Sequence, residues 1–315
     1  MSEPRISVII PAYNAAGWVA RAIESALVQT RPPHEVIVVD DGSSDDTADV
    51  ASAFGPRIQV VRQSNGGPAS ARNTGIHAST GDWIALLDAD DTWLPRKLEL
   101  QSLLMDDPKV GIIHARQTIK RGVAMPPHLS FELLWENNCI IASTVLLRRT
   151  CYDQVGGFDP DPNLIGVEDY NLWLRIADAG WVIAARMEWL ARYTPTSQSL
   201  SRDSVRFMKA ELVNLGKVAT LLSLPESAVR VKRERILTYY ATEFLYRRHI
   251  DEARNAYALL LGHGPNLAAV VGFGLTLLPR FVLDARRRWR AKADREEAEP
   301  YPAGIAARRA GTKPH

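Results

Sequence analysis

Short apolar segments that alternate with helical patterns constrain the fold of this chain most strongly. Each segment is four or five residues long and apolar enough for a buried strand, and the four lie at 6–10, 35–39, 58–61 and 83–87. Helical spacing separates them, as in residues 14–30 and 68–78. Because strands that alternate with helices favour parallel sheets, we expect an α/β fold with a mostly parallel, doubly wound sheet.

The later part of the chain changes character near residue 203. Further strands are expected at 110–115 and 142–148, and an amphipathic helix at 168–179. Beyond residue 203 the strand signals fade and helical periodicity takes over. The regions that we predict are an α/β domain at 1–202, a helical appendage at 203–262, an apolar and basic helix at 263–293, and a disordered tail at 294–315.

Composition excludes few classes of protein. The 315 residues carry a net charge of +2, with 46% hydrophobic and 23% charged residues, which is ordinary for a globular chain. Cys139 and Cys151 lack the spacing of a metal site, and two cysteines alone do not indicate a disulfide framework. We expect a cytoplasmic protein without a signal peptide, because no charged and then apolar leader precedes the first strand.

An acidic run closes the fourth apolar segment. Asp88, Asp90 and Asp91 follow residues 83–87 directly, where that strand leaves the sheet. Carboxylates grouped this closely repel each other, and a cation among them relieves the repulsion. Ligands also bind at strand ends in open α/β sheets. The segment therefore predicts a metal-assisted site.

Six motifs occur in an order that resembles one known family. They are Ser-Val-Ile-Ile-Pro-Ala-Tyr-Asn at 7–14, Asp-Asp-Gly-Ser at 40–43, the glycine-rich segment 65–75, Leu-Asp-Ala-Asp-Asp-Thr-Trp at 87–93, Gly-Gly-Phe-Asp at 156–159, and Glu-Asp at 168–169. Together they resemble the family 2 glycosyltransferases with the GT-A fold, over roughly residues 5–200. The resemblance implies a nucleotide-sugar donor.

The first two motifs are expected to hold the nucleoside. The resemblance implies that Pro11 and Tyr13 contact the nucleotide, although a plain turn in which Asn14 caps the next helix is an equal alternative on local grounds. Asp41 is the residue that the family likeness assigns to reading the base. An aspartate there can accept a hydrogen bond from the imide of uracil or thymine, and ordinary turn chemistry is the alternative.

The glycine-rich segment is expected to approach the nucleotide or its diphosphate. Free amides at Gly66 and Gly67 and the cation of Arg72 suit such a ligand. The segment is neither a P-loop nor a dinucleotide fingerprint. A loop with a surface arginine is the alternative, whereas the family likeness places Arg72 at the nucleotide.

The acidic run matches the DXD motif of the family. The resemblance implies Mn²⁺ or Mg²⁺ between the carboxylates and the donor diphosphate, with Asp90 as the direct ligand. We assign Asp88 to the ribose or to a metal-bound water, and Asp91 to capping the turn before Trp93. A solvated acidic loop is the alternative.

Glu168 and Asp169 begin a helix, where acidic residues often do no more than complement the helix dipole. After the 156–159 motif, which contributes Gly157 to the acceptor side, the pair resembles the ED motif of the family. The resemblance then implies that Glu168 and Asp169 are both catalytic residues, with Asp169 as the general base. One base and one metal-held leaving group imply a single displacement with inversion.

One segment departs from the family pattern. Many relatives carry an Arg-x-His stretch after the last strand, and this chain has Tyr193 to Ser201 there without either residue. We expect Thr196 or Ser197 to contact the diphosphate instead, or a water to complete the metal shell.

The sequence thus predicts an inverting glycosyltransferase that uses a UDP- or dTDP-sugar and a carbohydrate or lipid-linked acceptor, with no nucleic-acid partner. A metal-dependent phosphohydrolase is an alternative, but it leaves Asp41, Arg72 and the Glu168–Asp169 pair unexplained. A nucleotide-sugar binding module without activity is another. The apolar and basic stretch 266–292 suggests peripheral contact with the inner face of the cell membrane, and a core helix is the alternative.

Overall fold

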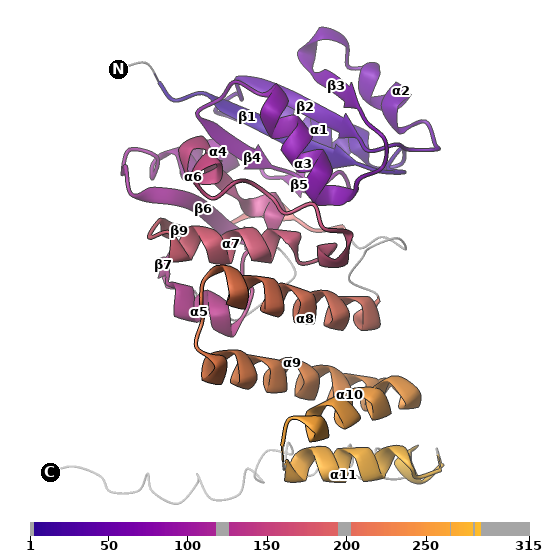
Figure 1. The fold of residues 1–315 in the computed structure, drawn as a ribbon. Coiled ribbons are helices and arrows are strands. Elements are labelled where there is room, and N and C mark those ends of the chain that lie inside the picture. The colour runs from indigo at the N-terminus through magenta and orange to yellow at the C-terminus, as the bar shows by residue number, and fades with distance from the viewer. Residues whose placement is uncertain (1–2, 118–125, 195–202, 265, 280, 285–315) are drawn as a thin grey trace, which may run out of the picture. The chain divides into compact units, whose positions relative to one another are not determined.

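The computed structural model describes residues 3–117, 126–194, 203–264, 266–279 and 281–284 (Figure 1). These residues form two compact units, at 1–236 and 237–315, and the division falls within helix α9 (Glu226–Arg247). The boundary that we predicted at 202/203 remains a proposal about domain organisation.

A parallel half-sheet forms the N-terminal part of the first unit. Its strands lie in the order β3-β2-β1-β4, and every pairing among them is parallel. The elements are β1 (Ile6–Ala12), α1 (Val19–Leu27), β2 (Glu35–Asp40), α2 (Thr47–Ser52), β3 (Gln59–Arg62), α3 (Gly67–Ala78) and β4 (Trp83–Leu86). The four apolar segments predicted as strands are therefore confirmed.

The rest of the sheet is mixed. Strand β8 runs antiparallel between β4 and β6, and β6 and β9 are parallel. The short strands β5 and β7 both pair antiparallel with β9. These elements are β5 (Thr92–Trp93), α4 (Lys97–Ser102), β6 (Val110–Gln117), β7 (His128–Leu129), α5 (Phe131–Glu136), β8 (Leu146–Arg148), α6 (Arg149–Gln154), α7 (Glu168–Asp178) and β9 (Val182–Arg192).

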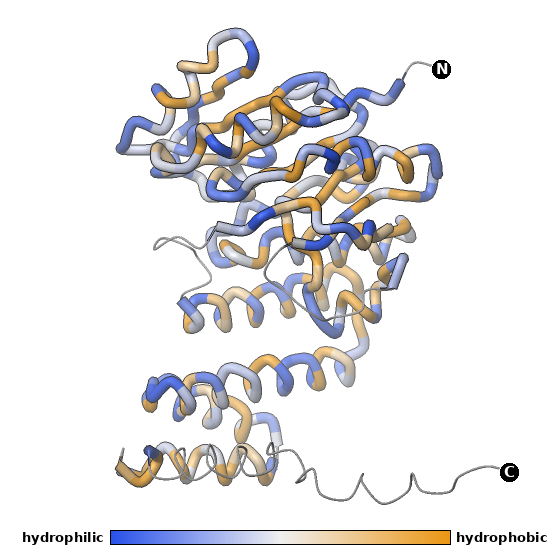
Figure 2. The backbone as a smooth tube through the Cα atoms, turned by 180° about the vertical axis from the view of Figure 1, so that it is seen from behind, coloured by the Kyte–Doolittle hydropathy of each residue, from blue (hydrophilic) through white to orange (hydrophobic). Residues whose placement is uncertain are grey.

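Apolar side chains cover both faces of the sheet. Because strand side chains alternate, Ile9 of β1 joins the core beneath α3 and α7, whereas Val8 and Ile10 join the core beneath α1 and α4. The apolar character of the central strands is visible along the chain in Figure 2. A layer of helices on each side of a central sheet is the arrangement expected from the alternating pattern.

Two predicted elements differ from the observed ones. The helix expected from residue 14 begins only at Val19, because Asn14 adopts the left-handed region at φ 48° and belongs to a loop. Of the strand expected at 142–148, the first residues form a 3₁₀ turn (Ala142–Thr144), and only Leu146–Arg148 pairs in the sheet.

The remaining helices follow the predicted periodicity. Helix α8 (Ser204–Leu221) lies in the first unit, where Asn214 accepts a hydrogen bond from the Asn171 side chain of α7. Helices α10 (Ile250–Gly262) and α11 (Leu267–Thr276) lie in the second unit. None of the described helices combines the length and apolar character needed to cross a membrane.

Candidate active site

The carboxyl ends of β2, β1 and β4 lie side by side at one edge of the sheet. Their order brings together the segments that follow Asp40, Ala12 and Leu86 (Figure 1). Ligands of open α/β sheets bind at this edge. The motifs at 11–14, 40–43 and 88–91 therefore share one region of the molecule.

Tyr13 and Asn14 form the loop after β1. The ring of Tyr13 is more than half exposed, so its face is accessible to a ligand. The Asn14 amide donates to Ser43 Oγ at 3.0 Å, and Asn14 Oδ1 accepts from the Ser44 amide at 2.9 Å. The alternative in which Asn14 caps helix α1 is wrong, because Trp18 occupies that position.

Asp41 organises the glycine-rich loop. One of its carboxylate oxygens accepts from the Gly66 amide and from Gln63 Nε2, at 2.8 and 2.7 Å. The other accepts from the Gly67 amide at 2.8 Å, and the residue is buried. Asp41 thus fixes the start of α3 beside β2. Whether it also reads a base stays a prediction.

Arg72 connects the acidic run with the Glu168–Asp169 pair. From α3, its guanidinium donates to Asp88 Oδ1 at 2.8 Å and to Glu168 Oε1 at 2.6 Å. The Phe158 ring lies 5.5 Å from the guanidinium carbon, and the Arg72 side chain is only 5% exposed. The surface arginine considered as an alternative is therefore wrong. Its proposed place at the nucleotide remains a prediction.

The Asp88 and Glu168 carboxylates keep the buried Arg72 side chain positively charged. Burial alone would lower the pKa of Arg72, but the charges of Asp88 and Glu168 outweigh burial and raise that pKa above its ordinary value. Arg72 Nε is buried and has no hydrogen-bond partner among the described atoms. Arg72 is therefore a permanent cation between the two motifs.

The acidic run retains an unfavourable concentration of negative charge. Burial and the neighbouring charge of Asp88 raise the pKa of Asp90 to about 6 and that of Asp91 to about 7. Asp91 also accepts from the Thr194 amide at 3.1 Å, and the Asp88 amide donates to Ser143 Oγ at 3.1 Å. The bond to Thr194 joins the acidic run to the segment that follows β9, and the capping of the turn before Trp93 by Asp91 stays a prediction.

Asp169 lies close enough to Asp88 and Arg72 for their charges to affect its pKa. Burial and the charges of Glu168 and Asp88 raise the pKa of Asp169 to about 7, although Arg72 and the Tyr170 amide act in the opposite direction. That amide donates to Asp169 Oδ1 at 2.6 Å. The fold thus brings residues 88 and 169 into one site, and it gives Asp169 a pKa suited to accepting a proton near neutral pH.

Glu168 has a different role from Asp169. One carboxylate oxygen is bound to Arg72, and the other accepts from the Gly166 amide at 2.6 Å. With both oxygens engaged and the side chain buried, Glu168 fixes the start of α7 rather than presenting a free carboxylate. The two residues of the Glu-Asp pair therefore differ: Glu168 has both carboxylate oxygens bound, whereas among the described residues Asp169 has one oxygen bound, to the Tyr170 amide.

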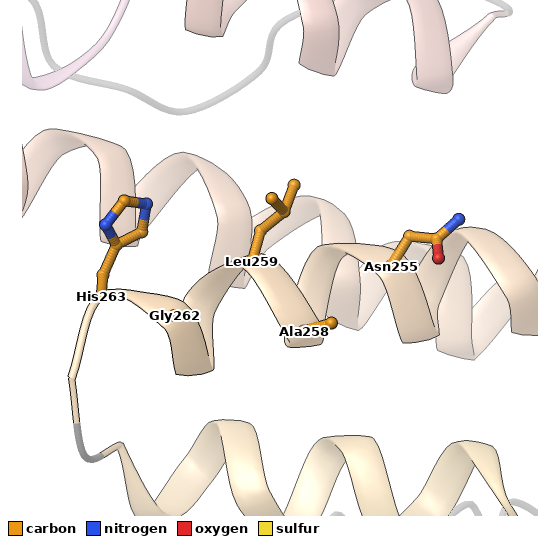
Figure 3. A pocket seen from close by; sticks show the side chains of 5 residues that line it. All are labelled: Asn255, Ala258, Leu259, Gly262 and His263. Carbon is orange, nitrogen blue, oxygen red and sulfur yellow. The ribbon is translucent and has the colours of Figure 1, made fainter.

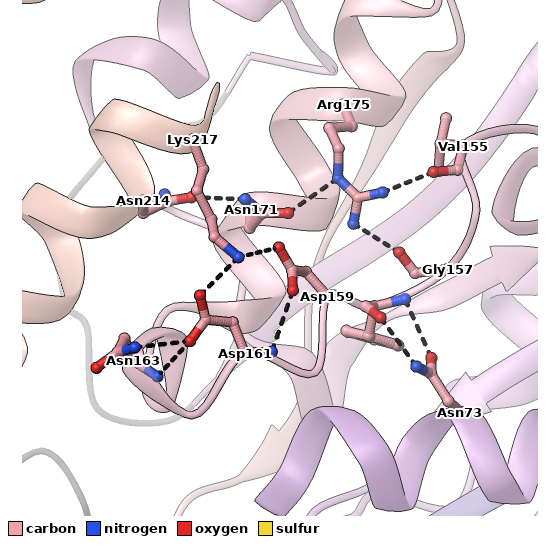
Figure 4. Close-up of polar contacts among 11 residues, drawn as sticks. Asn73, Val155, Gly157, Asp159, Asp161, Asn163, Asn171, Arg175, Asn214 and Lys217 are labelled. Carbon is pink, nitrogen blue, oxygen red and sulfur yellow. Dashed lines mark hydrogen bonds and ion pairs between the residues drawn. The ribbon is translucent and has the colours of Figure 1, made fainter. Parts of the chain in front are cut away.

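A hydrogen-bond network supports the loop at 155–161 (Figure 4). Asn73 donates to the Phe158 carbonyl and accepts from the Phe158 amide, at 2.9 and 3.0 Å. Arg175 donates to the carbonyls of Val155 and Gly157, each at 2.6 Å. Gly157 has φ 73°, and a Cβ there would meet the Tyr152 hydroxyl oxygen at 2.6 Å, so only glycine fits.

Sequence reasoning missed several supporting residues: Asn73, Ser143, Phe158 and Arg175. Asn73 and Phe158 stand inside motifs that were recognised, next to Arg72 and Gly157, so adjacency to a motif was the available signal. Arg175 and Ser143 had no such signal. Thr196 and Ser197 lie outside the described residues.

A surface hollow lies on α10, in the second unit. Asn255, Ala258, Leu259, Gly262 and His263 line it (Figure 3). This shallow depression contains none of the predicted site residues and no carboxylate.

Solved structures with the same architecture define the class of fold. TarS 1-349 from S. aureus covers 90% of this chain and 91% of its own, with a TM-score of 0.62 and 17% identity. The match with the mannosyltransferase PcManGT from Pyrobaculum calidifontis covers 96% of this chain and 89% of PcManGT, with a TM-score of 0.60 and 20% identity. The chain therefore has the GT-A glycosyltransferase fold, as predicted.

Sequence comparisons then give the family. Residues 7–157 match the model for glycosyl transferase family 2. The UDP-Glc:alpha-D-GlcNAc-diphosphoundecaprenol beta-1,3-glucosyltransferase WfgD of Escherichia coli is 30% identical over 226 residues, which are 69% of this chain and 87% of that protein. An uncharacterized glycosyltransferase of Rickettsia bellii is 45% identical over 109 residues, which are only 16% of its length. This chain belongs to glycosyl transferase family 2.

Proposed function

We propose that this protein is an inverting glycosyltransferase that moves a sugar from a UDP- or dTDP-sugar to an acceptor hydroxyl. The observation that carries the proposal is the Arg72 bridge, which joins Asp88 of the acidic run to Glu168 beside Asp169. A leaving-group site and a proton acceptor must lie on either side of one anomeric carbon for a single displacement. The bridge supports such an arrangement.

The donor side supplies binding and charge. Tyr13 would pack against the nucleoside and Pro11 would contact it, while Asp41 would read the base from the loop that it fixes. Asp88 would contact the ribose. Gly157 and the undescribed Thr196 and Ser197 would lie on the acceptor and diphosphate side.

A divalent cation fits the acidic run. Within the described residues, no three or more His, Cys, Asp or Glu side chains are grouped as a ligand set. Mg²⁺ or Mn²⁺ bound through one or two carboxylates and substrate phosphates needs no such group. Asp90 would hold it directly. Burial and the charge of Asp88 both raise the pKa of Asp90, and a bound cation would favour its ionised form. When bound, the cation stabilises negative charge on the departing diphosphate.

The acceptor side supplies the base. Asp169 would accept the proton of an acceptor hydroxyl while that oxygen forms its bond to the anomeric carbon. The bond between that carbon and the diphosphate breaks in the same step, so the nucleoside diphosphate leaves with the electron pair. Arg72 would hold Asp88 and Glu168 in place throughout this step.

Relatives support the substrate classes. WfgD and WfaP of Escherichia coli are named for UDP-Glc and a diphosphoundecaprenol-linked acceptor. TarS has been crystallised with UDP-GlcNAc, and PcManGT with GDP-Man and Mn²⁺. We therefore propose a lipid-linked or other carbohydrate acceptor, a place at the inner face of the cell membrane, and a catalytic domain at 1–202 followed by a helical appendage.

Asp90→Asn is expected to lower the affinity for UDP in the presence of Mn²⁺ by about tenfold or more, since one charged metal ligand is lost. Binding without metal should stay within about twofold, because Asp90 then has no cation to share with the diphosphate. Isothermal titration with UDP, dTDP and GDP, each with and without Mn²⁺, measures both effects.

Asp82→Asn is the matched control, because Asp82 is an exposed carboxylate at the opposite end of β4. Equal metal-dependent affinity of wild type and Asp90→Asn would refute the metal assignment. A wild-type chain that binds no nucleoside diphosphate under any of these conditions would overturn the proposed donor.

A further inference from the structure

Helix α11 is apolar on all sides, but only one side is covered. Its ten residues carry no charge. Ala269, Gly272 and Thr276 form the covered face, and a Cβ at Gly272 would lie 2.3 Å from the Tyr257 ring, so α10 and α11 touch closely there. A helix that is hydrophobic all round normally lies within a core or a membrane. The opposite face of α11 therefore lacks a partner within the described residues.

The uncovered face carries large exposed side chains, and more of them follow the end of the helix. Leu267 is 80% exposed and Phe281 is 74% exposed. We define the outer stripe as Leu267, Val270 and Val271 of α11 together with Leu277, Leu278 and Phe281, which follow the end of α11 at Thr276. Figure 2 shows the hydrophobic character of α11 along its length. Exposed apolar surface of this kind marks an interaction site.

The stripe is held in a fixed position on its own unit. The Asn266 side chain caps α11 by accepting from the Ala269 amide at 3.0 Å. At the other end, Arg254 donates to the Thr276 carbonyl at 2.9 Å. The cap defines the start of α11, and the bond from Arg254 joins the end of α11 to α10, so the helix presents its outer face from a defined position on its own unit.

The charge that follows the stripe selects the partner. Five of the seven residues at 286–292 are basic; this segment lies outside the described residues and begins five positions after Phe281 in the sequence. Basic residues that accompany an apolar surface favour an anionic lipid surface. A second copy of the chain carries the same positive charge, so repulsion disfavours it as the partner.

We infer that the outer stripe of α11 docks this protein on the surface of an anionic membrane. Ten helical residues extend about 15 Å, half the thickness of the hydrocarbon core, so α11 would lie in the interface rather than cross it. The inference deepens the proposed function, because it names the surface at which a lipid-linked acceptor would be met.

Vesicle co-sedimentation of the full chain tests this inference without turnover. The variant Leu267→Gln/Val271→Gln/Phe281→Gln removes apolar contact and leaves the charge unchanged. On vesicles with about one-third phosphatidylglycerol, it should bind at least about tenfold more weakly than wild type. Wild type should also bind phosphatidylcholine vesicles more weakly than anionic ones.

The matched control is Val28→Gln/Leu103→Gln/Leu221→Gln, which changes three exposed apolar residues of the first unit and should bind like wild type. Circular dichroism checks that both triple variants are folded. Equal vesicle binding by the α11 variant and wild type would overturn the inference. So would a wild-type dimer that the α11 variant cannot form, together with no vesicle binding. An inactive chain that still binds vesicles would contradict the proposed function alone.

Discussion

Asp169→Asn is expected to lower the rate of sugar transfer by about 10²- to 10⁴-fold, the usual contribution of a general base. The affinity for the nucleotide-sugar should stay within about twofold. Among the described residues, the Asp169 carboxylate forms its hydrogen bond with the Tyr170 amide and not with a residue assigned to the nucleotide. Steady-state kinetics together with titration of UDP separate these two effects. Thermal stability should not fall, since burial and the charges of Glu168 and Asp88 already disfavour the ionised carboxylate.

The control for this variant is Asp178→Asn, because Asp178 is an exposed carboxylate on the same helix. The pH profile separates proton transfer from mere positioning. Asp169 must be ionised to accept a proton, so wild-type activity should fall as the pH drops through its apparent pKa. That acid limb should be absent from the residual activity of Asp169→Asn. A variant with normal rate and an unchanged limb would place the base elsewhere.

Arg72→Gln is expected to reduce the free energy of unfolding by about 3 kcal/mol, because it leaves the buried Glu168 carboxylate without its cation. Asp88 and Glu168 would both lose an ionic hydrogen bond, and Glu168 is itself buried. Transfer should also fall, since the two motifs would no longer be held together. Urea denaturation at neutral pH measures the stability change.

Arg62→Gln provides the matched comparison. Arg62 also pairs with a buried aspartate, Asp40, but the Arg62 side chain is 68% exposed and Asp40 keeps its hydrogen bond from the Ser43 amide, so the loss of Arg62 should cost less than the loss of Arg72. The double variant Arg72→Gln/Glu168→Gln should recover part of the stability lost in Arg72→Gln, because one uncompensated charge disappears. Similar small losses for Arg62→Gln and Arg72→Gln would contradict a structural bridge.

The parallel half of the sheet could be predicted because its signals are local. Each strand from β1 to β4 is a short apolar run, and burial of both faces makes such runs easy to read. The start of α1 could not be predicted in the same way. Residues 14–18 fit a helical pattern, but the Asn14 side chain binds the Ser44 amide and the backbone turns into a loop instead.

Some features of the candidate site could likewise be predicted from the sequence, and others could not. Asp88, Asp90 and Asp169 could be named because each stands in a short motif. The pairing of Arg72 with Glu168 joins residues 96 positions apart, and one sequence carries no signal for such a contact. The hydrogen bonds from the glycine-rich loop to Asp41 could not be predicted for a related reason. An aspartate that binds backbone amides cannot be distinguished in the sequence from an aspartate that binds a base.

The central claim is that an acceptor oxygen, deprotonated by Asp169, displaces the metal-held diphosphate in a single step. The anomeric configuration of the first product tests this claim most directly. Water can replace the unknown acceptor, so proton NMR can follow hydrolysis of a UDP-sugar with Mn²⁺ before the released sugar mutarotates. The account predicts that the first sugar released has the anomeric configuration opposite to that of the donor. Release of the sugar with its original configuration would contradict the account.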